Sequence, residues 1–237
     1  METRQVSKFQ TAADAIKQIK DGSCLMIGGF GGVGTPPLLI KALLESGVKE
    51  LTVICNDSGF PDIGIGRLIV NKRIKKLITS HIGSNPIAGK MMTEGLLEVE
   101  FNPQGTLAER IRAGGTGLGG ILTDVGIGNS MLEKGKQKVK IGEKEYLLET
   151  PLTADAAFIK AKKADTYGNL IYSKTARNMN PLMAMAGRYT IAEIDEYDEE
   201  NGLNGEEIIT PGIFVQAIVQ SEGVNWKWAW EQAEEAE

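Results

Sequence analysis

The residues in this sequence that are best suited to bind a ligand or take part in chemistry form a glycine-rich stretch, 28–34. It holds five glycines and Phe30, and it lies between a short apolar run, 24–27, and an amphipathic segment that follows Thr35. Glycine permits positive φ and lets the backbone come close to another molecule. Because free N–H groups at a helix start attract anionic groups or a developing oxyanion, the stretch predicts a ligand-binding turn from a strand to a helix.

One interpretation of this stretch is a dinucleotide site. Gly29, Gly31 and Gly34 fit the pattern G-x-G-x-x-G, and Asp57 follows the next apolar run, 51–55, where it could bind a ribose. This predicts an NAD(P)-dependent oxidoreductase. In the other interpretation the glycines serve only the packing of a tight turn, so that no nucleotide is implied.

Apolar runs alternate with amphipathic segments through the first half of the chain, and these elements must position the glycine-rich stretch. Strands are expected at 24–27, 51–55, 74–80 and 97–102, and helices at 9–20, 38–44, 87–94 and 107–113. This alternation predicts an α/β fold with an open, mostly parallel, Rossmann-like sheet and helices on both faces.

Polar and glycine-rich groups fall at the carboxyl ends of the expected strands. They are the stretch 28–34, Asn56, the segment Gly83–Asn85 and Gln104. Ligands bind beyond the carboxyl ends of the strands in such sheets. We therefore expect these four loops to converge on one binding edge, with Asn56, Gly83 and Asn85 as contributors.

The second half of the chain changes in character. A charged hairpin within 116–150 predicts a small β-ribbon insertion, and further strands are expected at 156–161, 170–172 and 189–194, with a helix at 178–186. The acidic run 193–200 is interpreted as a solvated loop. We expect one domain over 1–220 and a Trp- and Glu-rich tail over 221–237, in which Trp226, Trp228 and Trp230 serve either an interface or packing against the chain itself.

Composition excludes several classes of protein. The chain has 237 residues, 42% of them hydrophobic, and a formal net charge of -5, which disfavours a nucleic-acid-binding face. The absence of a signal segment or membrane span, and two cysteines within apolar runs, predict a cytoplasmic protein with free thiols. There is no metal-binding spacing and no phosphate loop. The single histidine, His81, is interpreted as structural, so the chain has a binding edge without a convincing nucleophile.

From about residue 9 to about residue 219 the sequence resembles the alpha subunits of the family I coenzyme A transferases, the 3-oxoacid, acetate and butyrate–acetoacetate enzymes. The match runs through Asp21-Gly22, Leu25-Met26-Ile27, Gly28-Gly29-Phe30, Gly34 and Pro36. Segments 80–85, 103–115, 176–181 and 210–215 are similar to those subunits as well.

The resemblance implies ping-pong transfer of coenzyme A between short-chain acyl-CoA and carboxylates such as acetate, butyrate and acetoacetate. It places the nucleophilic glutamate in a Ser-Glu-Asn-Gly motif of a beta subunit. This chain lacks that motif, so we expect activity only with the partner, in an alpha-2-beta-2 or larger assembly. No metal or permanently bound cofactor is implied.

The same resemblance assigns roles to particular residues. Gln104 matches a glutamine that helps to form the oxyanion hole, and the segment that contacts CoA and the acyl group corresponds to Gly28, Gly29, Phe30, Gly31, Gly32, Val33 and Gly34. An alternative from another class is a non-catalytic sensor of acyl-CoA or a small ligand with the same fold.

Overall fold

The computed structural model describes residues 7–200 and 202–226. Its main sheet has the strand order β11-β10-β8-β1-β2-β3-β4, and all of these neighbours pair in parallel. The strands are β1 (Cys24–Ile27), β2 (Leu51–Ile54), β3 (Ile74–Thr79), β4 (Glu98–Phe101), β8 (Ala156–Asp165), β10 (Thr190–Asp198) and β11 (Ala217–Gln220). A short strand, β9 (Leu170–Ile171), pairs antiparallel with β8. The expected open, mostly parallel sheet is confirmed.

The order of the strands creates a switch point in the middle of the sheet. From β1 the chain moves outward through β2, β3 and β4, and it then returns to place β8 on the other side of β1. Crevices for ligands form at such reversals, beyond the carboxyl ends of the strands. The loop after β1 is the glycine-rich stretch, which the fold therefore puts at the position best suited to a site.

Helices cover both faces of the sheet because each central strand is buried on both sides. In β1, Leu25 and Ile27 enter one hydrophobic core, and Met26 enters the other. The first core is closed by α1 (Ala12–Ala15), α2 (Pro37–Glu45), α3 (Gly66–Val70) and α4 (Pro86–Thr93). The second is closed by α5 (Gln104–Thr116) and α7 (Asn180–Ala186).

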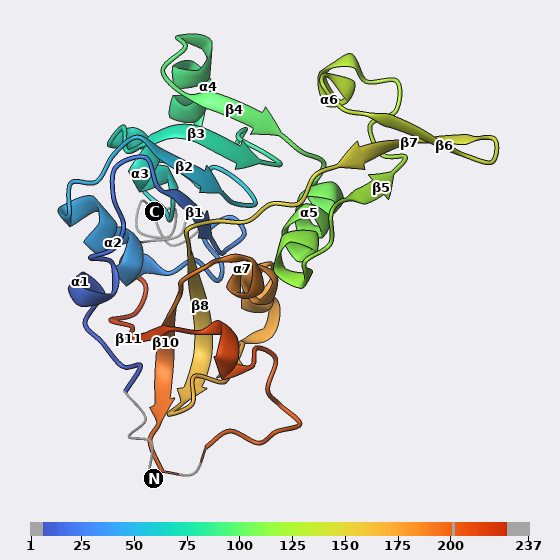
Figure 1. Cartoon of the computed structure of the whole chain (residues 1–237). Coiled ribbons are helices and arrows are strands. Elements are labelled where there is room, and N and C mark those ends of the chain that lie inside the picture. Colours follow the sequence, from blue (N-terminus) through green and yellow to red (C-terminus); the bar gives the residue numbers. More distant parts are fainter. Residues whose placement is uncertain (1–6, 201, 227–237) are drawn as a thin grey trace, which may run out of the picture.

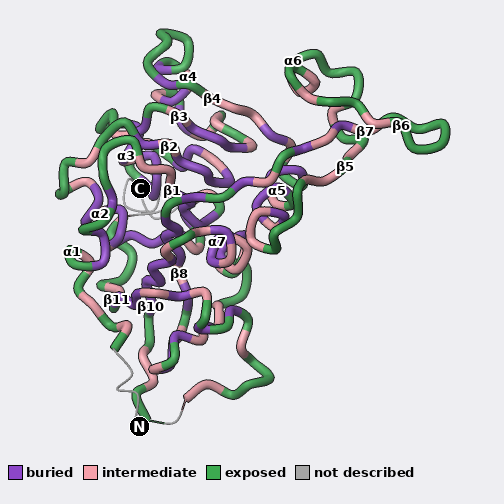
Figure 2. The backbone as a smooth tube through the Cα atoms, in the orientation of Figure 1, coloured by how far each residue is buried: buried purple, intermediate pink, exposed green. Residues whose placement is uncertain are grey.

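A three-stranded antiparallel sheet projects from the body beyond α5, and most of it is exposed or only partly buried (Figures 1 and 2). It consists of β5 (Ile121–Thr123), β6 (Lys138–Ile141) and β7 (Lys144–Glu149), with α6 (Ser130–Glu133) beside it. The expected β-ribbon is confirmed and gains a third strand. Its base is fixed by Arg110 of α5, which lies 3.8 Å from the buried carboxylate of Glu149 and donates to the Thr150 carbonyl at 2.8 Å.

Some expected elements differ from the structure. The first helix covers only Ala12–Ala15, and α3 had not been expected. The strand β10 extends to Asp198 through most of the acidic run, so the interpretation of 193–200 as a loop is wrong there: Glu193 is completely buried. Two short 3-10 turns, Lys174–Arg177 and Gly212–Phe214, complete the elements.

Within the described ranges, none of the helices has the length and apolarity needed to span a bilayer. Of the three tryptophans, Trp228 and Trp230 lie outside the described residues.

Candidate active site

The glycine-rich stretch forms a tight turn that projects an aromatic ring. Phe30 and Val33 exchange backbone hydrogen bonds of 2.9 Å in both directions, with Gly31 and Gly32 between them. The φ angles of these two glycines are +56° and +97°, the left-handed values that two-residue hairpin turns of this kind require. The turn leaves Phe30 55% exposed at the carboxyl end of β1.

A second turn of the same outline follows β2. The segment Gly59-Phe60-Pro61-Asp62-Ile63-Gly64 repeats the spacing Gly-Phe-x-x-aliphatic-Gly of residues 29–34, and Phe60 pairs with Ile63 as Phe30 pairs with Val33. Phe60 is 38% exposed. The repeated spacing is visible in the sequence, although only the first of the two turns was expected to bind a ligand.

Asp57 fastens the two turns together. Its carboxylate accepts from the backbone N–H of Gly31 at 2.9 Å, from that of Gly59 at 2.8 Å, and from Nδ2 of Asn56 at 2.8 Å. A carboxylate that accepts several N–H bonds is strongly stabilised in place. This residue is therefore committed to holding the backbone of the site.

Gln104 is the first residue of α5, directly after Pro103, and does not lie in a loop before the helix as expected. Its Nε2 donates to Oδ1 of Asn56 at 2.7 Å. The helix begins there because Pro103 holds an extended backbone, with φ of -53° and ψ of 137°. Loops after β2 and β4 thus bring Asn56 and Gln104 into direct contact, as their position at one sheet edge had predicted.

Two hollows, each of about 310 Å³, adjoin this contact. The rings of Phe30 and Phe60 line the first, together with His81, and Ala108 and Met179 line the second. Phe30, Asn56 and Gln104 line both hollows, so they form the wall that the two share. Side chains from the segments that follow β1, β2, β3 and β4 all line the first hollow.

Three of the loop glycines lie against other parts of the chain. A β-carbon on Gly28 would stand 1.8 Å from Oδ1 of Asn180, and one on Gly34 would stand 2.3 Å from the carbonyl oxygen of Ala176. Gly29 donates its N–H to Oδ1 of Asn178 at 3.3 Å. Packing against the segment 176–180 thus explains these glycines, and the sequence analysis had given this segment no role at the site.

The remaining predicted residues lie apart from the hollows. Asn85 is completely buried and caps α4, where its Oδ1 accepts from the N–H groups of Ile87 and Ala88 at 3.2 Å each. The expectation that Asn85 contributes to binding is therefore wrong, because capping uses this side chain inside the protein. Gly83 lines neither hollow; a β-carbon there would stand 2.9 Å from Nε2 of His81.

The structure contradicts the dinucleotide interpretation. The N–H groups of Leu38 and Leu39, at the start of α2, donate to the buried carboxylate of Glu193 at 2.9 and 3.1 Å. A pyrophosphate would need these groups, and the Asp57 carboxylate that a ribose would need is bound to backbone. Burial raises the pKa of Glu193, although Lys160 lies 3.6 Å away.

Neither cysteine is suited to be a nucleophile. Both are free thiols. Burial raises the pKa of Cys24 to about 11 and raises that of Cys55 further, so both stay protonated. Across 7–200 and 202–226, no three His, Cys, Asp or Glu side chains gather into a group that could hold a metal ion.

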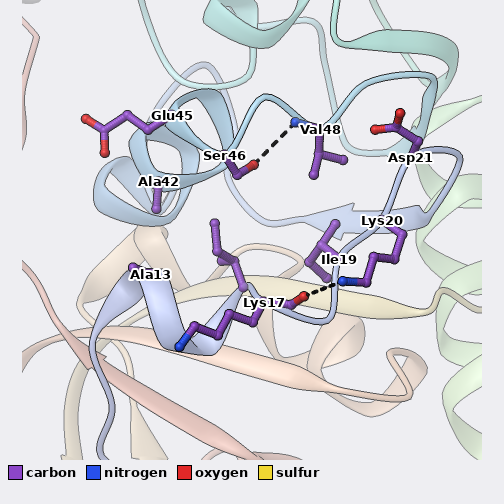
Figure 3. Close-up of a pocket in the computed structure, with 10 residues that line it drawn as sticks. Ala13, Lys17, Ile19, Lys20, Asp21, Ala42, Glu45, Ser46 and Val48 are labelled. Carbon is purple, nitrogen blue, oxygen red and sulfur yellow. Dashed lines mark hydrogen bonds between the residues drawn. The ribbon is translucent and has the colours of Figure 1, made fainter.

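Another hollow, of about 600 Å³, lies between α1 and the end of α2 (Figure 3). Lys17, Lys20, Asp21 and Glu45 surround an apolar floor there. These residues precede β1 and β2, so the hollow lies at the amino ends of the strands, away from the glycine turns. None of the candidate residues contributes to it.

Comparison with known proteins shows the family of the chain. The sequence pattern of the coenzyme A transferase family matches residues 9–221. The chain belongs to this family. It is 67% identical over 95% of its length to the whole of a probable coenzyme A transferase subunit alpha of Bacillus subtilis. It is 51% identical, over 85% of its length and 92% of the relative, to the alpha subunit of an acetoacetyl-CoA:acetate/butyrate CoA transferase of Clostridium acetobutylicum.

The fold is also that of a solved structure. An acyl-CoA transferase from Escherichia coli O157:H7, in a thioester complex with CoA, superposes with a TM-score of 0.79 at 23% identity. The match covers 91% of this chain and 47% of that longer one. The resemblance inferred from the sequence is thus confirmed, and neither an oxidoreductase nor a ligand sensor finds support.

Proposed function

We propose that this chain is the alpha subunit of a heteromeric enzyme that moves coenzyme A between short-chain acyl-CoA thioesters and carboxylates. Acetate, butyrate and acetoacetate are the proposed acyl groups, since a relative 51% identical to this chain carries them in its name. Relatives named alpha subunits imply a beta subunit as the partner. We further propose an alpha-2-beta-2 or larger assembly, a cytoplasmic location, and the division into a domain over 1–220 and a tail over 221–237.

The observation that carries the proposal is the position of the Gln104 amide. It lies at the wall shared by two hollows, at the carboxyl ends of the strands, with one N–H fixed on Asn56. Among the described residues Gln104 makes no other side-chain hydrogen bond, so its second N–H is available to an oxygen in either hollow. Acyl transfer builds negative charge on a carbonyl oxygen, and one positioned donor is worth about 3 kcal/mol of that barrier.

Among the described residues that line the hollows, the one carboxylate, Asp57, is held by three donors. The hydroxyls of Ser80 and Ser84 donate to backbone carbonyls, at 2.7 and 2.8 Å, and neither cysteine lines either hollow. This supports a nucleophile supplied by the partner, for which a glutamate is proposed. Its carboxylate attacks the thioester carbonyl and the C–S bond breaks. CoA thiolate departs, and an acyl–glutamyl anhydride remains.

The second half of the reaction regenerates the partner's glutamate. The thiolate attacks the glutamyl carbonyl of the anhydride, which expels the first carboxylate and leaves a glutamyl-CoA thioester. The acceptor carboxylate then attacks this thioester and expels CoA thiolate, which leaves a second anhydride. The thiolate attacks the acyl carbonyl of that anhydride, and this releases the new acyl-CoA and the free glutamate. Each attack develops one oxyanion, and we assign the Gln104 N–H to an oxyanion of this series.

Transfer between acetyl-CoA and butyrate, followed with the chain alone and with its beta subunit, tests the proposal. We expect activity only in the mixture. Transfer by the chain alone would place a nucleophile in this subunit and refute the proposed division of labour. Absence of transfer in the mixture, with acetoacetate also tried as acceptor, would refute the substrate class.

A further inference from the structure

The Gln104 amide can donate from the position that Nε2 occupies only if the orientation of its NH2 group and its carbonyl oxygen is fixed. The two ends of an amide side chain have almost the same shape, so packing alone does not choose between them. Gln104 is exposed, and its one side-chain hydrogen bond within the described chain is the 2.7 Å contact with Oδ1 of Asn56. Whatever fixes the orientation of Asn56 therefore fixes that of Gln104.

Asp57 provides a fixed point for this chain of hydrogen bonds. An ionised carboxylate only accepts, so Asn56 must turn its NH2 group toward Asp57, where Nδ2 lies 2.8 Å from Oδ2. The carbonyl oxygen of Asn56 then faces Gln104, which must present Nε2 in return. One negative charge thus orients two amides in sequence, Asn56 directly and Gln104 through Asn56.

The Asp57 carboxylate is itself held on its other sides by backbone. The N–H groups of Gly31 and Gly59 reach it at 2.9 and 2.8 Å from the two turns. Asn56 is 3% exposed, so water competes little for its amide. The main-chain carbonyl oxygen of Asn56 accepts hydrogen bonds from the N–H and the Oγ of Ser80. These bonds fix the backbone of Asn56 independently of its side chain.

We propose that Asp57 and Asn56 are positioning residues for catalysis. They form a carboxylate–amide relay that holds one N–H of Gln104 on Asn56 and leaves the second N–H of the same nitrogen for the acyl oxygen. This inference rests on the proposed function, because it needs Gln104 to be the oxyanion donor. Without the relay Gln104 turns freely, or presents its carbonyl oxygen, which repels a developing negative charge. The relay assigns to Asp57 a role in place of the ribose contact that the sequence had suggested.

A double-mutant cycle in the assembled alpha–beta enzyme tests the relay. Gln104→Ala alone should lower kcat by about a hundredfold, the effect of one lost oxyanion donor. Asn56→Ala and Asp57→Asn should each lower kcat by about tenfold. Without an oriented Asn56, the Gln104 side chain samples several rotamers, and few of these place its N–H where the oxyanion forms. KM should change by less than about twofold, since the donor acts in the transition state.

The decisive measurement is the same pair of substitutions in the Gln104→Ala background. There Asn56→Ala and Asp57→Asn should cost less than about twofold more, because no amide remains to be oriented. Equal losses in both backgrounds would mean a merely structural role and would overturn the relay. Glu143→Gln, which removes an exposed carboxylate from the turn between β6 and β7, away from both hollows, is the matched control and should leave kcat unchanged.

The outcomes separate this inference from the function on which it rests. Wild-type transfer with an unaffected Gln104→Ala variant refutes the oxyanion assignment. A strong Gln104→Ala effect with normal Asn56→Ala and Asp57→Asn variants refutes the relay alone. If Asp57→Asn does not assemble with the beta subunit, Asn56→Ala still decides, since it leaves the bonds to Gly31 and Gly59 in place.

Discussion

The ring of Phe60 should help to set the length of acyl group that the enzyme prefers. Phe60 and Phe30 are the two apolar walls of the first hollow and keep 38% and 55% of their surface exposed in this chain. A butyryl group has two methylenes more than an acetyl group, and burying each is worth about 0.8 kcal/mol. Full burial between the rings would favour butyryl-CoA by about 1.6 kcal/mol, or roughly 15-fold. If each ring supplies half of the contact, Phe60→Ala should reduce that preference about fourfold.

The assay is the ratio of kcat/KM for butyryl-CoA to that for acetyl-CoA, measured with the same acceptor in the assembled enzyme. A ratio is used because a general loss of activity cancels in it. Leu96→Ala is the control, since Leu96 is 54% exposed and lies between α4 and β4, away from both hollows. If Phe60→Ala lowers both values of kcat/KM equally, the ring does not contact the acyl chain and the reasoning fails.

Two further predictions concern stability. Gly28→Ala should destabilise the fold by about 1–3 kcal/mol in urea unfolding, because the new methyl group collides with buried Asn180; Gly89→Ala, which meets open space, should not, and equal midpoints for the two would contradict the packing argument. Although partial burial opposes it, hydrogen bonds from Arg110 and a lysine lower the pKa of Glu100 below its ordinary 4.5. A lowered pKa stabilises the folded state above that value and loses this contribution as pH falls, so Glu100→Gln should flatten the acid side of the stability curve. An unchanged pH profile would show that this ion pair contributes nothing.

The convergence of the site could be predicted because it follows from topology alone. Once 24–27, 51–55, 74–80 and 97–102 are accepted as parallel strands, their carboxyl ends must share one edge. Asn56 and Gln104, 48 positions apart, accordingly meet at 2.7 Å. The turn at Gly31 and Gly32 was predictable for a different, local reason: glycine favours the positive φ that both positions adopt.

What escaped the sequence was the use made of each polar group. An asparagine at a strand end can face a ligand site or cap the next helix, and the sequence does not distinguish Asn56 from Asn85. Both side chains are buried, and only their hydrogen-bond partners separate them. Glu193 stands in an acidic run that is typical of a solvated loop, yet it closes the start of α2 from a strand on the far side of β8. Such a contact depends on residues 155 positions apart, for which local pattern gives no signal.

The two aromatic turns that frame the first hollow should differ in stiffness. One reverses direction through Gly31 and Gly32, whose unfolded forms have the most conformations to lose; the other does so through Pro61 and Asp62, where the ring of proline has removed much of that freedom beforehand. The wall that carries Phe60 is thus set before a ligand arrives, and the wall that carries Phe30 can adjust to it. Acyl-CoA binding should therefore slow amide hydrogen exchange over residues 30–33 far more than over 60–63. The turn with Phe60 would then offer a preformed surface to the ligand, and the turn with Phe30 would become ordered around it.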